Sequence, residues 1–533
     1  MYRTVLIGLD GATFTVLDHL MAVDVMPFLK QFVERGVRAN LLSTPHPLTP
    51  PAWTSLATGR TPGHHGIFDF IRAEESPEGL YFTLNTSDDI RCETIWSMVS
   101  RQGGTVAALN YPVSYPPFQV NGYMIPGMVS WKHLRRAVHP AGFYEEMKAI
   151  PGFDAKVLSL DVNQEFKAIQ WLPREEYEDW ILLHIRREQQ WFGLVRTIME
   201  KHPTDLVAIV FDGVDKLQHL CWRFLDPDLA PYLSSAWEAK IRERCLEYFR
   251  LLDGFIRDIV DLAGPEARIF MASDHGFGPT KDVFYANVWL EREGYLSWAD
   301  QSSKDEVGKL GSDNLKNHVV GIDWTKTVAH ALSPSSNGIF IRQAEKPGQA
   351  GIPRAEYEAF RSRLAAKLAA VTHPETGKPL IKRVMTREEA FPGNESSRAP
   401  DLTLVLEDHS FISVLNADAP IKSRTEVAGT HRPEGVFMAA GAGIMGGRAL
   451  GAAPIIDVTP TLLYSLGLAV PSDLEGRVLA ECFDPSYAAR HPVVVGAPTT
   501  GLADKQGATA SAALPDEDQD KVIDRLKALG YIE

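Results

Sequence analysis

The chain has 533 residues, of which 45% are hydrophobic and 23% charged, and its formal net charge at pH 7 is −14. The 41 Gly and 35 Pro residues are too few for a collagen-like or low-complexity chain. The length suffices for one large α/β domain with insertions, or for two or three smaller domains. The negative charge argues against a nucleic-acid polymer as partner, because counterion release needs a basic face, and against an anionic membrane surface.

The beginning of the chain indicates a buried strand rather than a secretory signal. Residues 1–10 lack an apolar stretch followed by a small-residue cleavage site. No run approaches the roughly eighteen apolar residues that a membrane span needs, so we expect none. The cysteines show no CxxC spacing; they are Cys92, Cys221, Cys245 and Cys482. We therefore expect a cytoplasmic protein whose thiols are buried as small hydrophobic side chains.

Short apolar runs alternate with longer amphipathic stretches, which predicts an α/β fold with a mostly parallel sheet and helices on both faces. Strands rich in Val, Ile, Leu and Phe are expected at 4–9, 105–109, 206–211, 268–272, 402–406 and 436–440. Helices are expected at about 23–36, 52–58, 180–200, 235–263, 354–371 and 457–466.

Two long stretches, near 125–200 and 285–400, interrupt this alternation, and we interpret them as insertions that form a cap over the core. With these insertions the main domain is expected to span residues 1–494. Residues 495–516 have the composition of a linker, and apolar residues at helical spacing predict a C-terminal helix over 517–533.

Asp and His residues follow several of the expected strands, where α/β proteins build their sites. Asp10 ends the first strand. Asp274 and His275 follow the strand at 268–272, and His431 comes just before the last long apolar strand. Taken singly, a strand-end Asp is commonly a helix cap or turn residue, and a lone His is commonly a core residue. Structural roles of this kind do not readily explain all of these residues together.

Asp215 and His219 follow the strand at 206–211 with i, i+4 spacing, which puts two metal ligands on one helix face. Asp212 is an alternative ligand, although the spacing to His219 favours Asp215. Three carboxylates and three imidazoles at one sheet edge would be costly to desolvate without cations. Two divalent ions would leave about one positive charge, which suits an anionic ester, and the mixed ligands favour Zn²⁺ or Mn²⁺ over Mg²⁺ or Ca²⁺.

Thr49 is the candidate nucleophile. It precedes Pro50, a residue type that opens helices, so its hydroxyl is expected at a helix N-terminus. Beside a metal ion, a hydroxyl in that position can be held as an alkoxide. The local sequence alone favours Thr49 as a helix N-cap, and both roles stay open.

In order and spacing these segments resemble the alkaline phosphatase superfamily, and most closely its type I phosphodiesterase/nucleotide pyrophosphatase branch. The matching positions are Asp10, Thr49 through Thr58-Gly59, Asp215 to His219, Asp274-His275-Gly276 and Gly429-Thr430-His431. The resemblance covers about residues 1–480. It implies a three-layer α/β/α sandwich with cap-like insertions, and a hydrolase of phosphodiesters or nucleotide pyrophosphate bonds.

The resemblance also implies roles for the individual residues. One metal ion would be held by Asp215, His219 and His431. The other would be held by Asp10, Thr49, Asp274 and His275. Thr49 would attack phosphorus and form a phospho-threonine intermediate between the two ions. The expected partner is a small anionic phosphoester; the sequence leaves the oligomeric state open.

One departure from the family pattern keeps alternatives open. Ala52 stands three residues after Thr49, where the resemblance implies an Asn that holds the phosphoryl oxygens. Either backbone N–H groups take over that role or a residue from elsewhere does, and Asn110 is a candidate. A non-catalytic metal- or ligand-binding relative is therefore one alternative. A phosphoryl transferase, a mutase or a monoesterase of the same superfamily is another. Trp53, Phe68 and Phe70 are candidate lining residues for the substrate, although such aromatics are more commonly core residues.

Overall fold

The computed structural model describes residues 4–499 except 77–78, 160–171, 300–320, 334, 345 and 347. The expected helix over 517–533 and most of the expected linker lie outside the described residues. Within the described part of the chain, no helix combines the length and the hydrophobicity needed to cross a bilayer.

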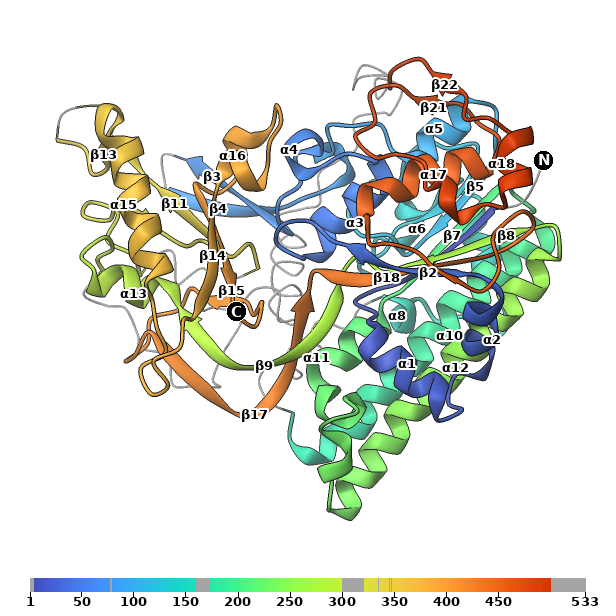
Figure 1. Ribbon diagram of the computed structural model, residues 1–533, viewed down its shortest axis with the longest axis horizontal. Helices are drawn as coiled ribbons and strands as arrows, with labels where there is room; N and C mark the ends of the chain where they lie inside the picture. The colour runs from blue at the N-terminus through green and yellow to red at the C-terminus, as the bar shows by residue number, and fades with distance from the viewer. Residues whose placement is uncertain are drawn as a thin grey trace.

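A large mixed sheet forms the centre of the molecule (Figure 1). Its order is β19 (Arg448–Ala449), β2 (Val37–Leu42), β18 (Glu434–Gly441), β8 (Arg268–Ala272), β1 (Thr4–Leu9), β7 (Leu206–Phe211), β5 (Val106–Leu109) and β6 (Gly122–Ile125), with β20 (Ala453–Pro454) beside β2. β1 pairs in parallel with β7 and β8, whereas β18 is antiparallel to both of its neighbours. Every residue of β1, β7 and β8 is buried, as expected for parallel strands covered on both faces.

Helices cover both faces of this sheet (Figure 1). One face carries α1 (Phe14–Ala22), α2 (Pro27–Arg35), α10 (Tyr177–Lys201), α11 (Gly213–Leu225) and α12 (Ala236–Ala263). The other carries α3 (Thr49–Thr58), α5 (Ile95–Arg101), α17 (Val458–Ser465) and α18 (Pro485–Arg490). Alternation along β1 serves both cores, because Val5 and Ile7 pack on the first face and Leu6 on the second. The predicted three-layer α/β/α sandwich is confirmed.

A smaller unit, which we call the cap, projects from the sandwich on a long ribbon (Figure 1). The ribbon consists of β9 (Gly276–Tyr285) and β17 (Ile421–Arg432), paired antiparallel. The cap contains an antiparallel sheet in the order β10 (Ala329–His330), β11 (Gly338–Ile341), β15 (Leu402–Leu406) and β14 (Ile381–Thr386). Its core includes residues of α13 (Ala286–Arg292) and α15 (Tyr357–Ala369).

Several elements differ in place from the sequence prediction. The strand expected at 402–406 exists as β15, but it belongs to the cap and not to the central sheet. The helix expected at 23–36 corresponds to α2 alone, because Asp24 has a positive φ of 59° and separates it from α1. In the stretch 125–200, α10 packs on α12 and against β7, so this part of the chain builds a layer of the sandwich.

Candidate metal centre

The candidate site lies at the edge of the central sheet where three parallel strands end. Asp10 directly follows β1, and Asp274 and His275 follow β8. Asp215 lies in the first turn of α11, which begins just after β7. Because β7, β1 and β8 are parallel neighbours, their carboxyl ends meet at one edge and bring these side chains together.

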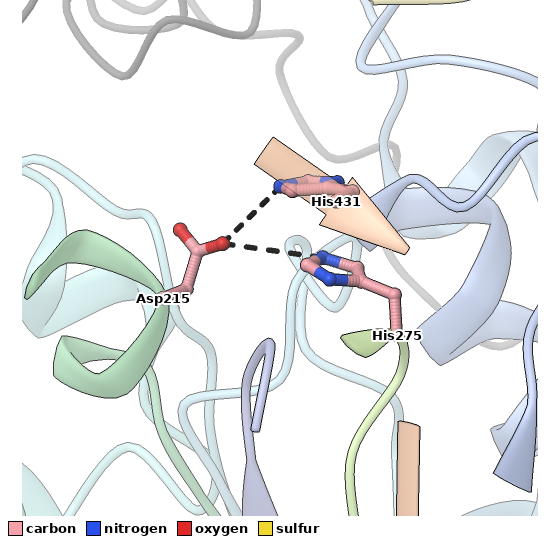
Figure 2. Close-up of side chains that lie close together, drawn as sticks. All are labelled: Asp215, His275 and His431. Carbon is pink, nitrogen blue, oxygen red and sulfur yellow. Dashed lines mark ion pairs between the residues drawn. The ribbon is translucent and has the colours of Figure 1, made fainter. Parts of the chain in front are cut away.

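Two further histidines approach the same edge from other elements. His219 lies one helical turn after Asp215 on α11. His431 lies on β17 opposite Phe277 of β9, so the ribbon to the cap carries it over the strand ends. Figure 2 shows the rings of His275 and His431 both facing Asp215; the ring centroids lie 3.5 Å apart with an interplanar angle of 21°.

Asp10, Asp274 and His275 form one group of possible metal ligands, with donor atoms within 4.8 Å of one another. His275 Nε2 lies 3.7 Å from Asp10 Oδ1 and 3.2 Å from Asp274 Oδ2. All three side chains are buried. Neither of those two carboxylate oxygens receives a hydrogen bond from the described residues. Buried acceptors that face a third acceptor form a suitable site for a cation.

Asp215, His275 and His431 form a second group of possible ligands with donor atoms within 4.8 Å of one another, and His219 adjoins it. Asp215 Oδ1 lies 3.4 Å from His219 Nε2 and 3.3 Å from His431 Nε2. The two Nε2 atoms are 3.1 Å apart. His275 Nε2 is 4.0 Å from the same Asp215 oxygen, so the two groups share His275.

Backbone carbonyls determine which nitrogen of each central imidazole faces the site. His431 Nδ1 donates to the carbonyl of Pro47 at 2.9 Å, and His275 Nδ1 donates to the carbonyl of Gly276 at 3.1 Å. A carbonyl only accepts, so these rings carry their proton on Nδ1 when neutral. Burial lowers the pKa of His275 well below its usual value and that of His431 to about 4, which keeps both rings neutral at pH 7. Their Nε2 lone pairs therefore point at carboxylates.

The carboxyl groups of the site are also buried close to groups that disfavour their negative charge. Burial, together with the charges of Asp274 and Asp215, raises the pKa of Asp10 well above its usual value. Burial also raises the pKa of Asp274. At Asp215, burial acts in the same direction, but His219 and Lys216 outweigh it and the pKa falls well below the usual value. Divalent cations among these groups would relieve both the repulsion and the unsatisfied acceptors, so the donor set fits metal binding.

Thr49 lies at the start of α3, and its Oγ1 is 3.4 Å from His275 Nε2. Leu48, with φ −138° and ψ 137°, occupies the N-cap position, so Thr49 is the first helical residue and not the cap. The hydroxyl is buried beside the group formed by Asp10, Asp274 and His275. The positive end of α3 favours negative charge on this oxygen.

The structure adds site contacts that the sequence prediction missed. Trp53 Nε1 donates to Asp10 Oδ2 at 3.1 Å, and Lys216 Nζ lies 3.4 Å from Asp215 Oδ2. Both side chains are buried. Trp53 follows Thr49 by four residues in a helix, so the two side chains lie on one face. That spacing could have indicated that Trp53 lies near the site. Nothing in the local pattern distinguishes Lys216 from a surface lysine.

Other candidate residues serve elsewhere. The Asp212 carboxylate pairs with Arg187 at 3.1 Å and accepts a hydrogen bond from the Asn110 amide at 3.3 Å. Asp212 and Asn110 therefore contact each other at the end of the sheet. Phe70 is buried in the core that the cap shares with the sandwich. Phe68 is half-buried, and it lines a separate pocket considered below.

A three-layer sandwich with a cap and this cluster of Asp, His and Thr at the strand ends defines an alkaline phosphatase-like protein. A sequence model of the type I phosphodiesterase/nucleotide pyrophosphatase family matches residues 4–433. The chain therefore belongs to that family, and the resemblance drawn from its motifs is confirmed. Family membership supports phosphoester hydrolysis.

Solved structures agree with this fold. Murine ectonucleotide pyrophosphatase/phosphodiesterase 5 has a TM-score of 0.50 and 14% identity, over 90% of this chain and 100% of that one. Phosphonoacetate hydrolase from Sinorhizobium meliloti, in complex with phosphonoacetate, has a TM-score of 0.52 and 17% identity, over 87% and 95% of the two chains. No curated protein matches the sequence at a significant level.

Replacing Trp53 tests whether its indole positions a metal ligand. Trp53→Phe removes the donor to Asp10, and we expect affinity for a divalent ion to fall about 10–100-fold, as for other lost partners of metal ligands. The affinity is measured by competition with a chelating indicator. Trp96→Phe is the matched control, because Trp96 is buried in the same core. Equal metal affinity in Trp53→Phe and the unmodified protein would contradict the role.

Proposed function

We propose that the chain is a two-metal phosphoester hydrolase that acts through a phospho-threonine intermediate on Thr49. The observation that carries this proposal is the position of the Thr49 hydroxyl. It lies 3.4 Å from His275 Nε2, at a helix N-terminus and beside buried carboxylates. A buried hydroxyl among metal-binding groups has the surroundings that activate a nucleophile.

In this proposal the seven predicted residues divide into two ligand sets. Asp215, His219 and His431 hold one ion through the atoms that face one another at 3.1–3.4 Å. Asp10, Asp274 and His275, with Thr49, hold the other. Bound divalent ions would supply the positive charge that lowers the hydroxyl pKa and neutralises the phosphoryl oxygens. The mixed imidazole and carboxylate donors favour Zn²⁺ or Mn²⁺.

Two displacements at phosphorus complete the reaction. Thr49 Oγ1 gives its proton to solvent and forms a bond to phosphorus while the bond to the leaving oxygen breaks, and the leaving oxygen takes up a proton from solvent. Water then attacks the phospho-threonine, the bond to Thr49 Oγ breaks, and phosphate or a phosphomonoester leaves. The N-terminus of α3 stabilises the negative charge that Thr49 Oγ carries before attack and after release.

The family membership favours a phosphodiester or a nucleotide pyrophosphate bond as the substrate. Two divalent ions and the buried Lys216 exceed the charge of the three carboxylates, so the site attracts a small anion. The complex of the Sinorhizobium hydrolase with phosphonoacetate is consistent with a small phosphorus-containing anion in this fold. We place this activity in the cytoplasm, as the sequence predicts.

Thr49→Ala tests the nucleophile. Without the hydroxyl no phospho-threonine forms, and we expect kcat to fall by at least about 10³-fold. Metal content should stay largely intact, because Asp10, Asp274 and His275 remain. Turnover and metal content are measured on the same preparation. Thr58→Ala is the matched control, because Thr58 is also buried on α3 but donates to the carbonyl of Thr54. An active Thr49→Ala protein would refute the mechanism, and a fully metal-loaded, inactive unmodified protein would favour the non-catalytic alternative.

Comparison of bis-p-nitrophenyl phosphate with p-nitrophenyl phosphate tests the substrate class. We expect a higher kcat/KM for the diester on protein loaded with Zn²⁺ or Mn²⁺, because the family acts on diesters. Preference for the monoester would overturn the diester assignment and leave the metal site intact. Phosphoryl transfer to an added alcohol, in place of water, would identify a transferase.

A further inference from the structure

A cavity, which we call the joint pocket, lies between the sandwich and the cap. Its volume is about 540 Å³, within the range of small-molecule sites. One wall includes Phe68, Arg72 of β3 (Ile71–Ser76), Phe82 of β4 (Gly79–Leu84) and Arg91. The other includes Ser333, Phe340 and Arg398 of the cap. None of the seven residues of the candidate metal centre lines the described pocket.

The charged residues that line the joint pocket are Arg72, Arg91, Arg398, Asp69 and Asp89. Arg91 and Arg398 come from opposite walls and both approach Gly66, where a Cβ atom would lie 3.1 Å from Arg91 Cγ, 3.2 Å from Arg398 Nη1 and 3.4 Å from Glu395 Cγ. Arg398 lies 3.4 Å from a carboxylate oxygen of Glu395. Arg91 is exposed and forms no ion pair within the described ranges. Such a pair of planar, permanently charged groups suits an anionic oxygen group.

The carboxyl groups of the pocket wall are largely withdrawn from the cavity. Asp89 pairs with Arg72, and only 8% of Asp89 is exposed. Asp69 is 6% exposed, and its Oδ1 accepts hydrogen bonds from the hydroxyl of Ser335 and from the amide of Phe70, both at 2.6 Å. Among the described lining residues, Arg91 is the exposed charged group that no ion pair neutralises, and its charge is positive.

The remaining lining suits a flat, partly apolar body. Phe68, Phe82 and Phe340 are half-buried and line the cavity. Asn85 and Ser333 add polar groups, and Asn85 Oδ1 is a buried acceptor that receives no hydrogen bond from the described residues. Aromatic side chains pack against flat rings, while an amide oxygen selects a donor on the ligand.

We propose that the joint pocket binds a small organic anion that carries a flat ring. Arg91 and Arg398 hold the anionic group, and the phenylalanine rings contact the body. This binding site goes beyond the proposed hydrolysis, because it requires neither Thr49 nor a metal ion. Two sources have this chemistry: the part of an ester substrate remote from the reacting phosphorus, and a separate small molecule.

Contacts connect the floor of the joint pocket with the segment that leads to the nucleophile. The Ser335 hydroxyl donates a hydrogen bond to Asp69, and the Ser335 carbonyl contacts His46 Nε2. His46 is buried and lies three residues before Thr49. A ligand on this floor is therefore separated from the nucleophile segment by only a few side chains.

Titration calorimetry with 2-naphthalenesulfonate tests the site on the full chain loaded with metal. We expect binding to the unmodified protein and a loss of at least about tenfold in affinity for Arg91→Gln/Arg398→Gln, which removes two charge-assisted hydrogen-bond partners. Phe340→Leu should also weaken binding. Arg363→Gln is the control for loss of charge, because Arg363 is exposed on α15. Absence of binding, or equal affinity in the double arginine variant, would overturn the proposal.

Inhibition of hydrolysis distinguishes the two sources. If the pocket holds part of the substrate, the probe raises KM for bis-p-nitrophenyl phosphate in the unmodified protein and not in Arg91→Gln/Arg398→Gln. If the natural ligand is a separate molecule, the probe binds without competing. Both results support the site. Calorimetry measures binding of the probe without turnover. A protein that binds the probe but does not hydrolyse esters would contradict the proposed hydrolysis alone, and one that hydrolyses esters but does not bind the probe would contradict this site alone.

Discussion

Repulsion among buried acceptors at one sheet edge is the constraint on which the rest of the site depends. Asp10, Asp215 and Asp274 lie there with imidazoles whose Nε2 atoms point toward them. The carbonyls of Pro47 and Gly276 fix those rings and so prevent the lone pairs from turning away. A protein maintains such an arrangement when cations complete it, since isolated buried charges are otherwise costly.

The order of the parallel strands and the ribbon to the cap together form this edge. Parallel β7, β1 and β8 end side by side, and the helices on both faces exclude water from them. The ribbon of β9 and β17 adds a different constraint. It begins directly after His275 and returns with His431, so the chain between these two residues includes the whole cap. The placement of the cap and the geometry of the candidate metal centre are therefore mechanically linked.

Much of this could be predicted from the sequence, because the relevant information is local. Continuous apolar runs at 4–9, 206–211 and 268–272 became β1, β7 and β8, and strand ends in a parallel sheet must meet. What could not be predicted depends on contacts between distant segments. The run at 402–406 is equally apolar, yet its partners are β11 and β14 of the cap. Likewise, no local pattern shows that Lys216 is buried beside Asp215 or that Pro47 orients His431.

The most direct test of the account is anomalous diffraction from crystals grown with Zn²⁺ or Mn²⁺, recorded at the absorption edge of the metal. We expect two peaks about 4 Å apart, the separation typical of two-metal sites. One should lie among the donors of Asp215, His219 and His431, and the other among those of Asp10, Asp274 and His275. A single peak, or peaks away from these side chains, would contradict a two-metal centre at this edge of the sheet.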